Sequence, residues 1–276
     1  MRKHNFIDKH PVGASVLIGF VIFIAIQTIG AFPPAMYEAV TGNEAPLLEM
    51  LSMIAATAIV MLIYKKRFSP EYKGVVRLEG LAEGLLMGLP ILAYWIIASI
   101  PSVIDGTFVV KPLTAQILSS AVVAGVIEEA AFRHGIITTM LRNRNQKENL
   151  IKVLLISGTV FGLIHMLNMA IGADPIRTIL QSVGAIGFGV FFGAIFVTTG
   201  NILPSMILHA AHDIFAIVTS TDVSDAGMIT AGGVGLSQII DFACMIALGV
   251  FAVIRYMPND KKDEIVALWN RIWSKD

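Results

Sequence analysis

The chain has 276 residues, of which 55% are hydrophobic and only 14% are charged. A soluble domain carries about 25% charged residues, and the mean hydropathy of +0.75 also indicates a membrane protein with little soluble mass. The formal net charge is zero, so no overall basic field suggests a nucleic-acid partner. The single cysteine, Cys244, excludes an intramolecular disulfide and a multi-cysteine metal site.

Eight apolar stretches are long enough to cross a bilayer, which takes about 20 residues for each helix. In chain order they are roughly 13–32, 46–64, 80–100, 113–141, 151–170, 176–199, 202–220 and 236–256. We therefore expect an all-α polytopic membrane protein, a bundle of about eight transmembrane helices. A single membrane domain over 1–276 is expected, with its catalytic core at about 113–220.

Basic residues alternate between the two predicted ends of the bundle. They cluster before residue 13, between 65 and 77, between 142 and 152, and from 255 onward, whereas the intervening loops hold few. By the positive-inside rule, we expect both termini of this integral membrane protein to be cytoplasmic. An even number of spans agrees with that orientation.

The tail 258–276 has apolar residues at helical spacing. They are Ile265, Leu268, Trp269, Ile272 and Trp273. The spacing predicts a short amphipathic helix that lies on the cytoplasmic membrane surface; a partner-binding tail is the alternative.

Ionisable side chains near the bilayer centre cost about 2.5–3.5 kcal/mol each, so those that occur usually have a partner or a function. The predicted spans hold Glu128, Glu129, Arg133, His165, His209, His212 and Asp213, and we expect Asp241 at the membrane interface. A rise of about 1.5 Å per residue places the groups on three of these helices roughly 12–21 Å from the cytoplasmic ends. Three helices therefore bring polar groups within reach of one cavity.

Glu128 and Glu129 are adjacent and so about 100° apart on an α-helix, and we expect them to point to different places. Glu129 and Arg133 are four residues apart and can form a buried ion pair. Glu128 has no local partner. One turn before it, Ala124 and Gly125 leave room for another backbone or for a substrate. A desolvated, unpaired glutamate suits a general base.

Three short motifs now stand in order: Glu128-Glu129-x-x-x-Arg133, Phe161-x-x-x-His165 and His209-x-x-x-Asp213. Together they resemble the motifs of the CPBP intramembrane proteases. That family includes the type II CAAX prenyl endopeptidases and Abi-type bacterial relatives linked to bacteriocin processing or self-immunity. The resemblance implies eight spanning helices in a prokaryotic cell membrane, a membrane-associated peptide or protein substrate, and an active site that opens to the cytoplasm.

The resemblance also implies roles for individual residues. Glu128 and His165 would activate water, and His209 and Asp213 would stabilise the oxyanion. The supporting residues would be Glu129, Arg133 and Phe161, with His212 beside the motif. Many members have asparagine where this chain has Asp213. An ionised carboxylate cannot donate a hydrogen bond to an oxyanion, so Asp213 is protonated, orients His209 or binds a metal.

Two alternatives to the metal-free protease follow from the same residues. Glu128, His165, His209 and Asp213 are plausible ligands for zinc or another divalent metal, although the leading hypothesis requires no cofactor. Intramembrane Glu, His and Asp side chains also form proton relays. The second alternative is therefore a non-enzymatic immunity or scaffold protein, or a proton-coupled transporter.

Overall fold

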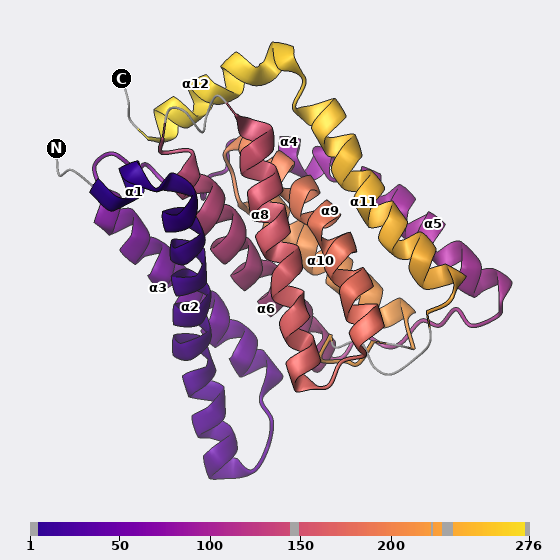
Figure 1. The fold of residues 1–276 in the computed structure, drawn as a ribbon. Coiled ribbons are helices and arrows are strands. Elements are labelled where there is room, and N and C mark those ends of the chain that lie inside the picture. The colour runs from indigo at the N-terminus through magenta and orange to yellow at the C-terminus, as the bar shows by residue number, and fades with distance from the viewer. Residues whose placement is uncertain (1–4, 144–148, 222, 228–233, 274–276) are drawn as a thin grey trace.

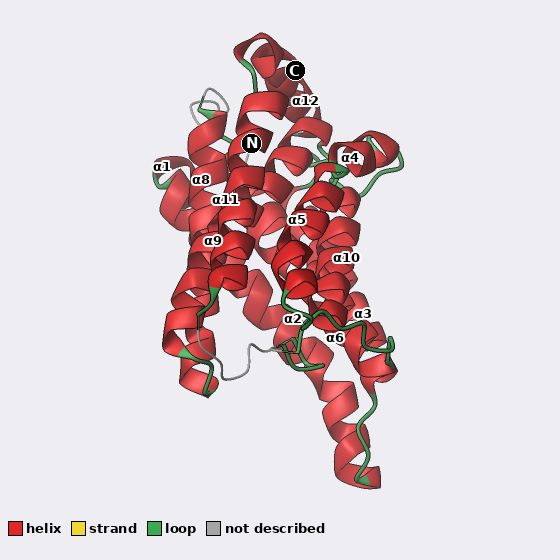
Figure 2. Cartoon of the chain, turned by 90° about the vertical axis from the view of Figure 1, so that its right-hand side faces the viewer, coloured by secondary structure: helices red, strands yellow, loops and turns green. Residues whose placement is uncertain are grey.

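A computed structural model shows the chain as a bundle of helices (Figure 1). The structure describes residues 5–143, 149–221, 223–227 and 234–273. Its helices in chain order are α1 (Asn5–Lys9), α2 (Pro11–Thr41), α3 (Pro46–Phe68), α4 (Leu81–Met87), α5 (Pro90–Ile104), α6 (Ala115–Glu128), η1 (Glu129–Thr138), α8 (Leu150–Ile164), η2 (His165–Ile171), α9 (Pro175–Thr199), α10 (Leu203–Thr219), α11 (Leu236–Tyr256), η3 (Asn259–Lys261) and α12 (Lys262–Ile272). Within these ranges there is no strand (Figure 2).

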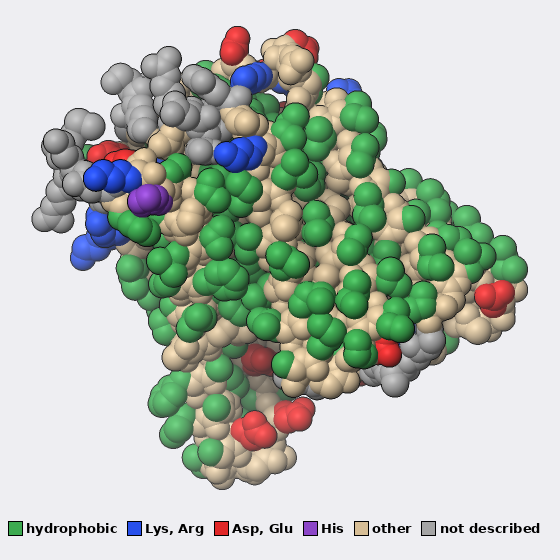
Figure 3. Space-filling model, in the orientation of Figure 1, with side chains coloured by type: hydrophobic (Ala, Val, Ile, Leu, Met, Phe, Trp, Pro, Cys, Tyr) green, Lys and Arg blue, Asp and Glu red, His purple; other side chains and the backbone are tan. Residues whose placement is uncertain are grey.

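The expected all-helical fold is confirmed, and the expected count of about eight spanning helices is roughly consistent with the structure. Seven helical stretches of the described residues are long and apolar enough to cross a membrane, and α10 is a shorter apolar helix of 17 residues. α1 and α12 lie at the same end of the bundle (Figure 1), which agrees with an even number of crossings. Lysine and arginine side chains gather at this end, and apolar side chains cover the middle of the visible face (Figure 3).

Local sequence signals begin the three helices that carry or border the motifs. Thr114, Asn149 and Asp174 precede α6, α8 and α9, and each side chain accepts a hydrogen bond from the backbone N–H three residues later. Such caps satisfy backbone donors that have no partner within the helix. At the other end of α9, Gly200 has a φ of 60°, a left-handed conformation that favours glycine.

The amphipathic helix expected in the tail is α12, but its apolar face does not lie on lipid. The Trp269 and Trp273 side chains are fully buried. Trp269 Nε1 donates to the carbonyl oxygen of Val197 at 2.8 Å, and Trp273 Nε1 donates to that of Thr138 at 3.1 Å. The helix therefore covers the end of the bundle, because its indole N–H groups find buried carbonyl partners there. Residues 274–276 of the predicted tail lie outside the described residues.

The helix expected at 113–141 changes type at the first motif. It is an α-helix up to Glu128 and a π-helix from Glu129 to Thr138. Hydrogen bonds in a π-helix run from residue i to i+5, and such turns are frequent at functional sites. The Ser157 hydroxyl of α8 donates to the carbonyl oxygen of Phe132 within it, at 2.9 Å. Neighbouring helices thus supply partners to the π-helical backbone.

A glycine lets α10 approach α6 directly beside the glutamates. A Cβ atom added at Gly125 would lie 2.8 Å from the backbone nitrogen of Ala210 and 2.9 Å from the carbonyl oxygen of Met206. The small residue expected to leave room for another backbone does so. This contact sets the distance between the first and third motifs.

We predict that Gly125→Ala destabilises the protein by about 1–3 kcal/mol, because a methyl group forced against a helix backbone must separate the helices. The measurement is thermal unfolding of the purified protein in detergent. Gly13→Ala is the matched control, because a Cβ atom there meets nothing within 4 Å. Equal melting temperatures for the two variants would contradict the prediction.

Candidate active site

The buried ion pair expected between Glu129 and Arg133 is confirmed. Arg133 Nε lies 3.1 Å from Glu129 Oε2, and both side chains are 0% exposed. The guanidinium carbon of Arg133 lies 4.3 Å from the ring centroid of Phe161 and 5.8 Å from that of Phe192. The arginine is therefore held by one carboxylate and two aromatic faces, a setting that suits a planar, weakly hydrated cation.

Glu129 also contacts the third motif. Its Oε1 atom lies 2.9 Å from Nδ1 of His209 on α10. The His209 ring stacks on Phe192, with centroids 5.2 Å apart, and meets Phe161 edge-on at 5.7 Å. One carboxylate thus joins Arg133 to His209, and two phenylalanines fix the plane of the imidazole.

The other nitrogen of His209 faces two further carboxyl groups. Nε2 lies 3.7 Å from Glu128 Oε2 and 3.6 Å from Asp213 Oδ2. Both distances are longer than a hydrogen bond, so the contacts are electrostatic. Glu128 and Glu129 therefore point to different places, as expected, and these places are the two nitrogens of one imidazole. The contact of Glu129 with this ring was not predicted.

His165 begins the 3₁₀-helix η2, where α8 ends. Its Nδ1 atom lies 2.9 Å from the carbonyl oxygen of Phe161. A carbonyl oxygen can only accept, so Nδ1 donates. In the neutral ring this hydrogen bond leaves Nε2 as a proton acceptor. The second motif therefore holds its histidine in one tautomer through the residue one turn earlier.

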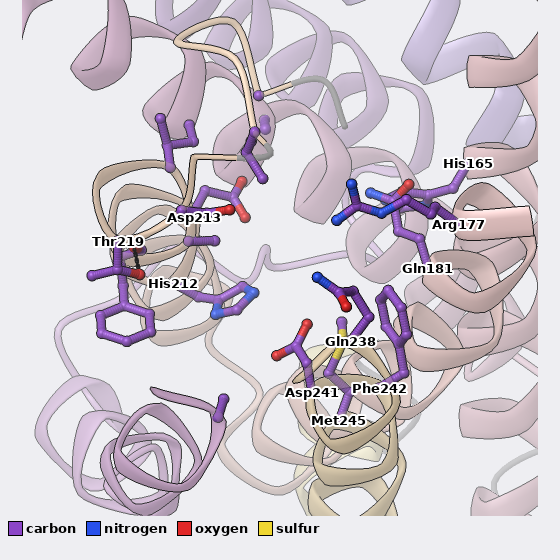
Figure 4. Close-up of a pocket in the computed structure, with 18 of the residues that line it drawn as sticks. His165, Arg177, Gln181, His212, Asp213, Thr219, Gln238, Asp241, Phe242 and Met245 are labelled. Atoms are coloured by element: carbon purple, nitrogen blue, oxygen red, sulfur yellow. Dashed lines mark hydrogen bonds between the residues drawn. The ribbon is translucent and has the colours of Figure 1, made fainter. Parts of the chain in front are cut away.

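A cavity of about 540 Å³ brings the predicted catalytic residues together. Glu128, His165, His209 and Asp213 all line it, and Figure 4 shows His165 and Asp213 on opposite sides. The Glu128 side chain is 21% exposed whereas that of Glu129 is 0% exposed. Glu128 is thus the glutamate that faces the cavity, and Glu129 lies behind it.

The cavity reaches the end of the bundle opposite α1 and α12. Its lining includes Thr107 after α5 and Thr221 and Gly227 after α10, all exposed, and these connections lie far from the termini (Figure 1). The cytoplasmic termini predicted from the basic loops and the cytoplasmic opening implied by the family resemblance both stay predictions.

His212 also lines the cavity but has other partners than His209. Its Nδ1 atom accepts a hydrogen bond from Trp95 Nε1 at 3.4 Å, and its ring lies 4.3 Å from that of Phe188. On α10, His212 is rotated about 60° around the helix axis from His209, and it does not share the contact of His209 with Glu129. His212 therefore belongs to the aromatic wall of the cavity.

The sequence reasoning missed three residues of the cavity: Tyr94, Arg177 and Asp241. Asp241 was expected at the membrane interface, yet it is half-buried and accepts a hydrogen bond from the Tyr94 hydroxyl at 2.6 Å. The signal was present in the spacing of Gln238 and Asp241, two polar residues on one face of an apolar helix. The hydrogen bond from Tyr94 on α5 could not be predicted without the fold.

The side chains do not form a ready metal site. Among the described residues, no group of three or more His, Cys, Asp or Glu side chains is arranged to hold a metal ion. Nε2 of His209 nevertheless faces the Glu128 and Asp213 carboxylates at 3.7 and 3.6 Å, and its Nδ1 atom contacts Glu129, a contact that metal-ligating histidines also make. The alternative in which Glu128, His165, His209 and Asp213 hold zinc or a similar ion therefore stays a prediction.

We predict that Glu129→Gln and Arg133→Met each destabilise the protein by about 3–5 kcal/mol, because each leaves a buried charge without its partner. The double variant should lose less than the sum, because it buries neither charge. Unfolding of the four proteins in the same detergent measures the coupling. Purely additive losses would mean that the two side chains do not act as a pair.

The comparison with protein families agrees with this geometry. Residues 110–215 match the family model described as type II CAAX prenyl endopeptidase Rce1-like. The matched range contains all three motifs and runs from before α6 into α10. A search among curated proteins finds no match. The resemblance indicated by the motifs is confirmed over this range: residues 110–215 are similar to the Rce1-like family of type II CAAX prenyl endopeptidases.

Proposed function

We propose that this protein is an intramembrane endopeptidase that hydrolyses a peptide bond of a membrane-associated substrate. One observation carries the proposal. A single cavity within the apolar bundle is lined by Glu128, His165 and His209, which come from three different helices. Peptide hydrolysis needs an activated water molecule and a site for developing negative charge, and these side chains can supply both. The family match supports the same class of reaction.

In the first step, Glu128 and His165 activate water. The Glu128 carboxylate accepts a proton from the water, and Nε2 of His165 accepts the other water hydrogen in a hydrogen bond. The water oxygen then forms a bond to the carbonyl carbon of the substrate. The Phe161 carbonyl assists because it holds the His165 proton on Nδ1, which leaves Nε2 to act as acceptor.

The carbonyl oxygen gains negative charge as this bond forms, and His209 stabilises it. In this role His209 is doubly protonated: Nδ1–H donates to Glu129, and Nε2–H donates to the oxyanion. Glu129 Oε1 lies 2.9 Å from Nδ1 and so sets the direction in which Nε2 points, and Arg133 holds Glu129. Donors fixed before the reaction need no reorganisation during it.

In the last step, the carbon–nitrogen bond breaks and its electron pair goes to the leaving nitrogen. That nitrogen takes the proton that Glu128 received from water. Glu128 returns to its ionised form. The acid product keeps the second hydrogen of the water and passes it to the amine on release, so the products are a carboxylate and an ammonium group. Asp213 donates nothing in this sequence. It lies 3.6 Å from His209 Nε2 and stabilises the imidazolium through its charge.

We predict that Glu128→Gln, His165→Asn and His209→Gln each lower the cleavage rate about 10²- to 10⁴-fold, the range for loss of an acid–base group. The measurement uses purified protein in proteoliposomes and a fluorogenic peptide that partitions into the bilayer. Thermal unfolding of each variant shows that the fold is retained.

Glu83→Gln is the matched control for Glu128→Gln, because Glu83 is an exposed glutamate at the start of α4 that does not line the cavity. It should cleave like the wild type. Wild-type rates for Glu128→Gln would refute the assignment of the general base, and a wild-type protein that cleaves no such peptide would favour a non-enzymatic role.

We also predict that overnight dialysis against a metal chelator leaves the cleavage rate within about twofold of the untreated protein. The reason is that the proposed steps are carried by Glu128, His165 and His209 without a metal ion. A rate that falls on chelation and returns with added zinc would overturn the metal-free mechanism.

A further inference from the structure

One face of α11, with two polar and two apolar side chains, lines the cavity and takes no part in the proposed mechanism. Gln238, Asp241, Phe242 and Met245 all line the cavity, and their spacing of i, i+3, i+4 and i+7 is that of one helix face. Figure 4 shows them together, opposite His165 and Arg177. An acidic side chain on such a face of a membrane helix usually serves a function or has a partner.

The fold gives Asp241 one hydrogen-bond donor and leaves part of it accessible. Among the described residues its hydrogen-bond donor is the Tyr94 hydroxyl, at 2.6 Å from Oδ1. Tyr94 is itself fixed edge-on against Phe188, at 5.3 Å between ring centroids. A carboxylate can accept about four hydrogen bonds, and the Tyr94 hydroxyl occupies one of these positions. The other positions are open to a molecule in the cavity. Asp241 is half-buried, which places these positions away from bulk water but within reach of a bound molecule.

The charges of the cavity favour a cation beside Asp241. Within the part of the chain that the structure describes, the cavity is lined by three carboxyl groups, those of Glu128, Asp213 and Asp241, and by two cations, Arg177 and the His209 imidazolium of the proposed mechanism. A concave site with an excess of one sign, enclosed by apolar helices, concentrates the opposite charge. Glu128 and Asp213 already face His209, whereas Asp241 forms no ion pair with any residue that the structure describes.

The neighbours of Asp241 match a side chain with an apolar stem and a charged end. Phe242 and Met245 line the same part of the cavity, and Asp241 comes directly before Phe242 and one turn before Met245. Lysine and arginine bury their methylene groups on apolar surface while the charged group seeks a polar partner. A carboxylate in a pocket beside the reacting groups can set the preference for the residue next to the cleaved bond.

We infer that Asp241 is a specificity-determining residue that binds the lysine or arginine side chain of a substrate residue close to the cleaved bond. This inference rests on the proposed endopeptidase function and adds a substrate preference to it. The expected substrate is a membrane-associated segment that is mostly apolar and carries a basic residue near the cleavage position. Tyr94 acts through Asp241 by holding its carboxylate toward the cavity.

The test compares two fluorogenic peptides that differ at one residue, lysine in one and norleucine in the other, with that position scanned across the cleaved bond. For the wild type, lysine at one position should raise kcat/KM relative to norleucine by roughly 10- to 100-fold. Asp241→Asn, which keeps the shape and can still accept from Tyr94, should remove this advantage and leave the norleucine peptide unchanged. Asp105→Asn is the matched control, because Asp105 is an exposed aspartate outside the cavity lining.

Two results would overturn the inference: no preference for lysine at any position in the wild type, or an equal loss for both peptides in Asp241→Asn, which would indicate a structural role. Binding separates this inference from the proposed function. In a Glu128→Gln background, where cleavage is blocked, fluorescence anisotropy should show weaker binding of the lysine peptide when Asp241→Asn is added, by a similar factor. If the wild type cleaves neither peptide, the endopeptidase proposal fails, and the binding comparison still decides the role of Asp241.

Discussion

The site depends on a buried carboxylate that has two partners. Glu129 is fully enclosed, and it contacts Arg133 at 3.1 Å and His209 at 2.9 Å. A buried charge without partners costs several kcal/mol, and removal of one partner from a pair leaves that penalty with the other. The ion pair within the π-helix therefore does more than stabilise one segment: it fixes a histidine on a different helix. Phe161 and Phe192, packed against both Arg133 and His209, complete this support.

Burial separates the two adjacent glutamates by role. Glu129 has both oxygens engaged and no exposed surface, whereas Glu128 keeps 21% of its side chain exposed toward the cavity. The close approach of α10 at Gly125 brings His209 between them. Glu129, not Glu128, forms the ion pair with Arg133. Glu128 therefore keeps its charge available for the reaction, and the cavity that it lines extends to exposed loops.

Much of this fold follows from the sequence, because helix spans and i,i+4 pairs are local properties. The eight apolar stretches and the Glu129–Arg133 pair are confirmed. The contact between Glu129 and His209 was not predicted, because it depends on how α6 and α10 pack and on a π-helical turn that no local pattern announces. Asp241 was expected at the interface because it lies near the start of the last span, and its hydrogen bond to Tyr94, 147 positions away in sequence, was not predicted. The tail was placed on lipid because amphipathicity does not say whether the apolar face meets lipid or protein.

The most direct measurement of the central claim is a double-mutant cycle on kcat/KM with Glu129→Gln, His209→Gln and the variant that carries both. If Glu129 acts on the reaction by orienting His209, the double variant should be no slower than His209→Gln alone, because Glu129 then has nothing left to orient. If the two losses instead multiply, Glu129 contributes independently of His209, and the account of the buried carboxylate given above is contradicted.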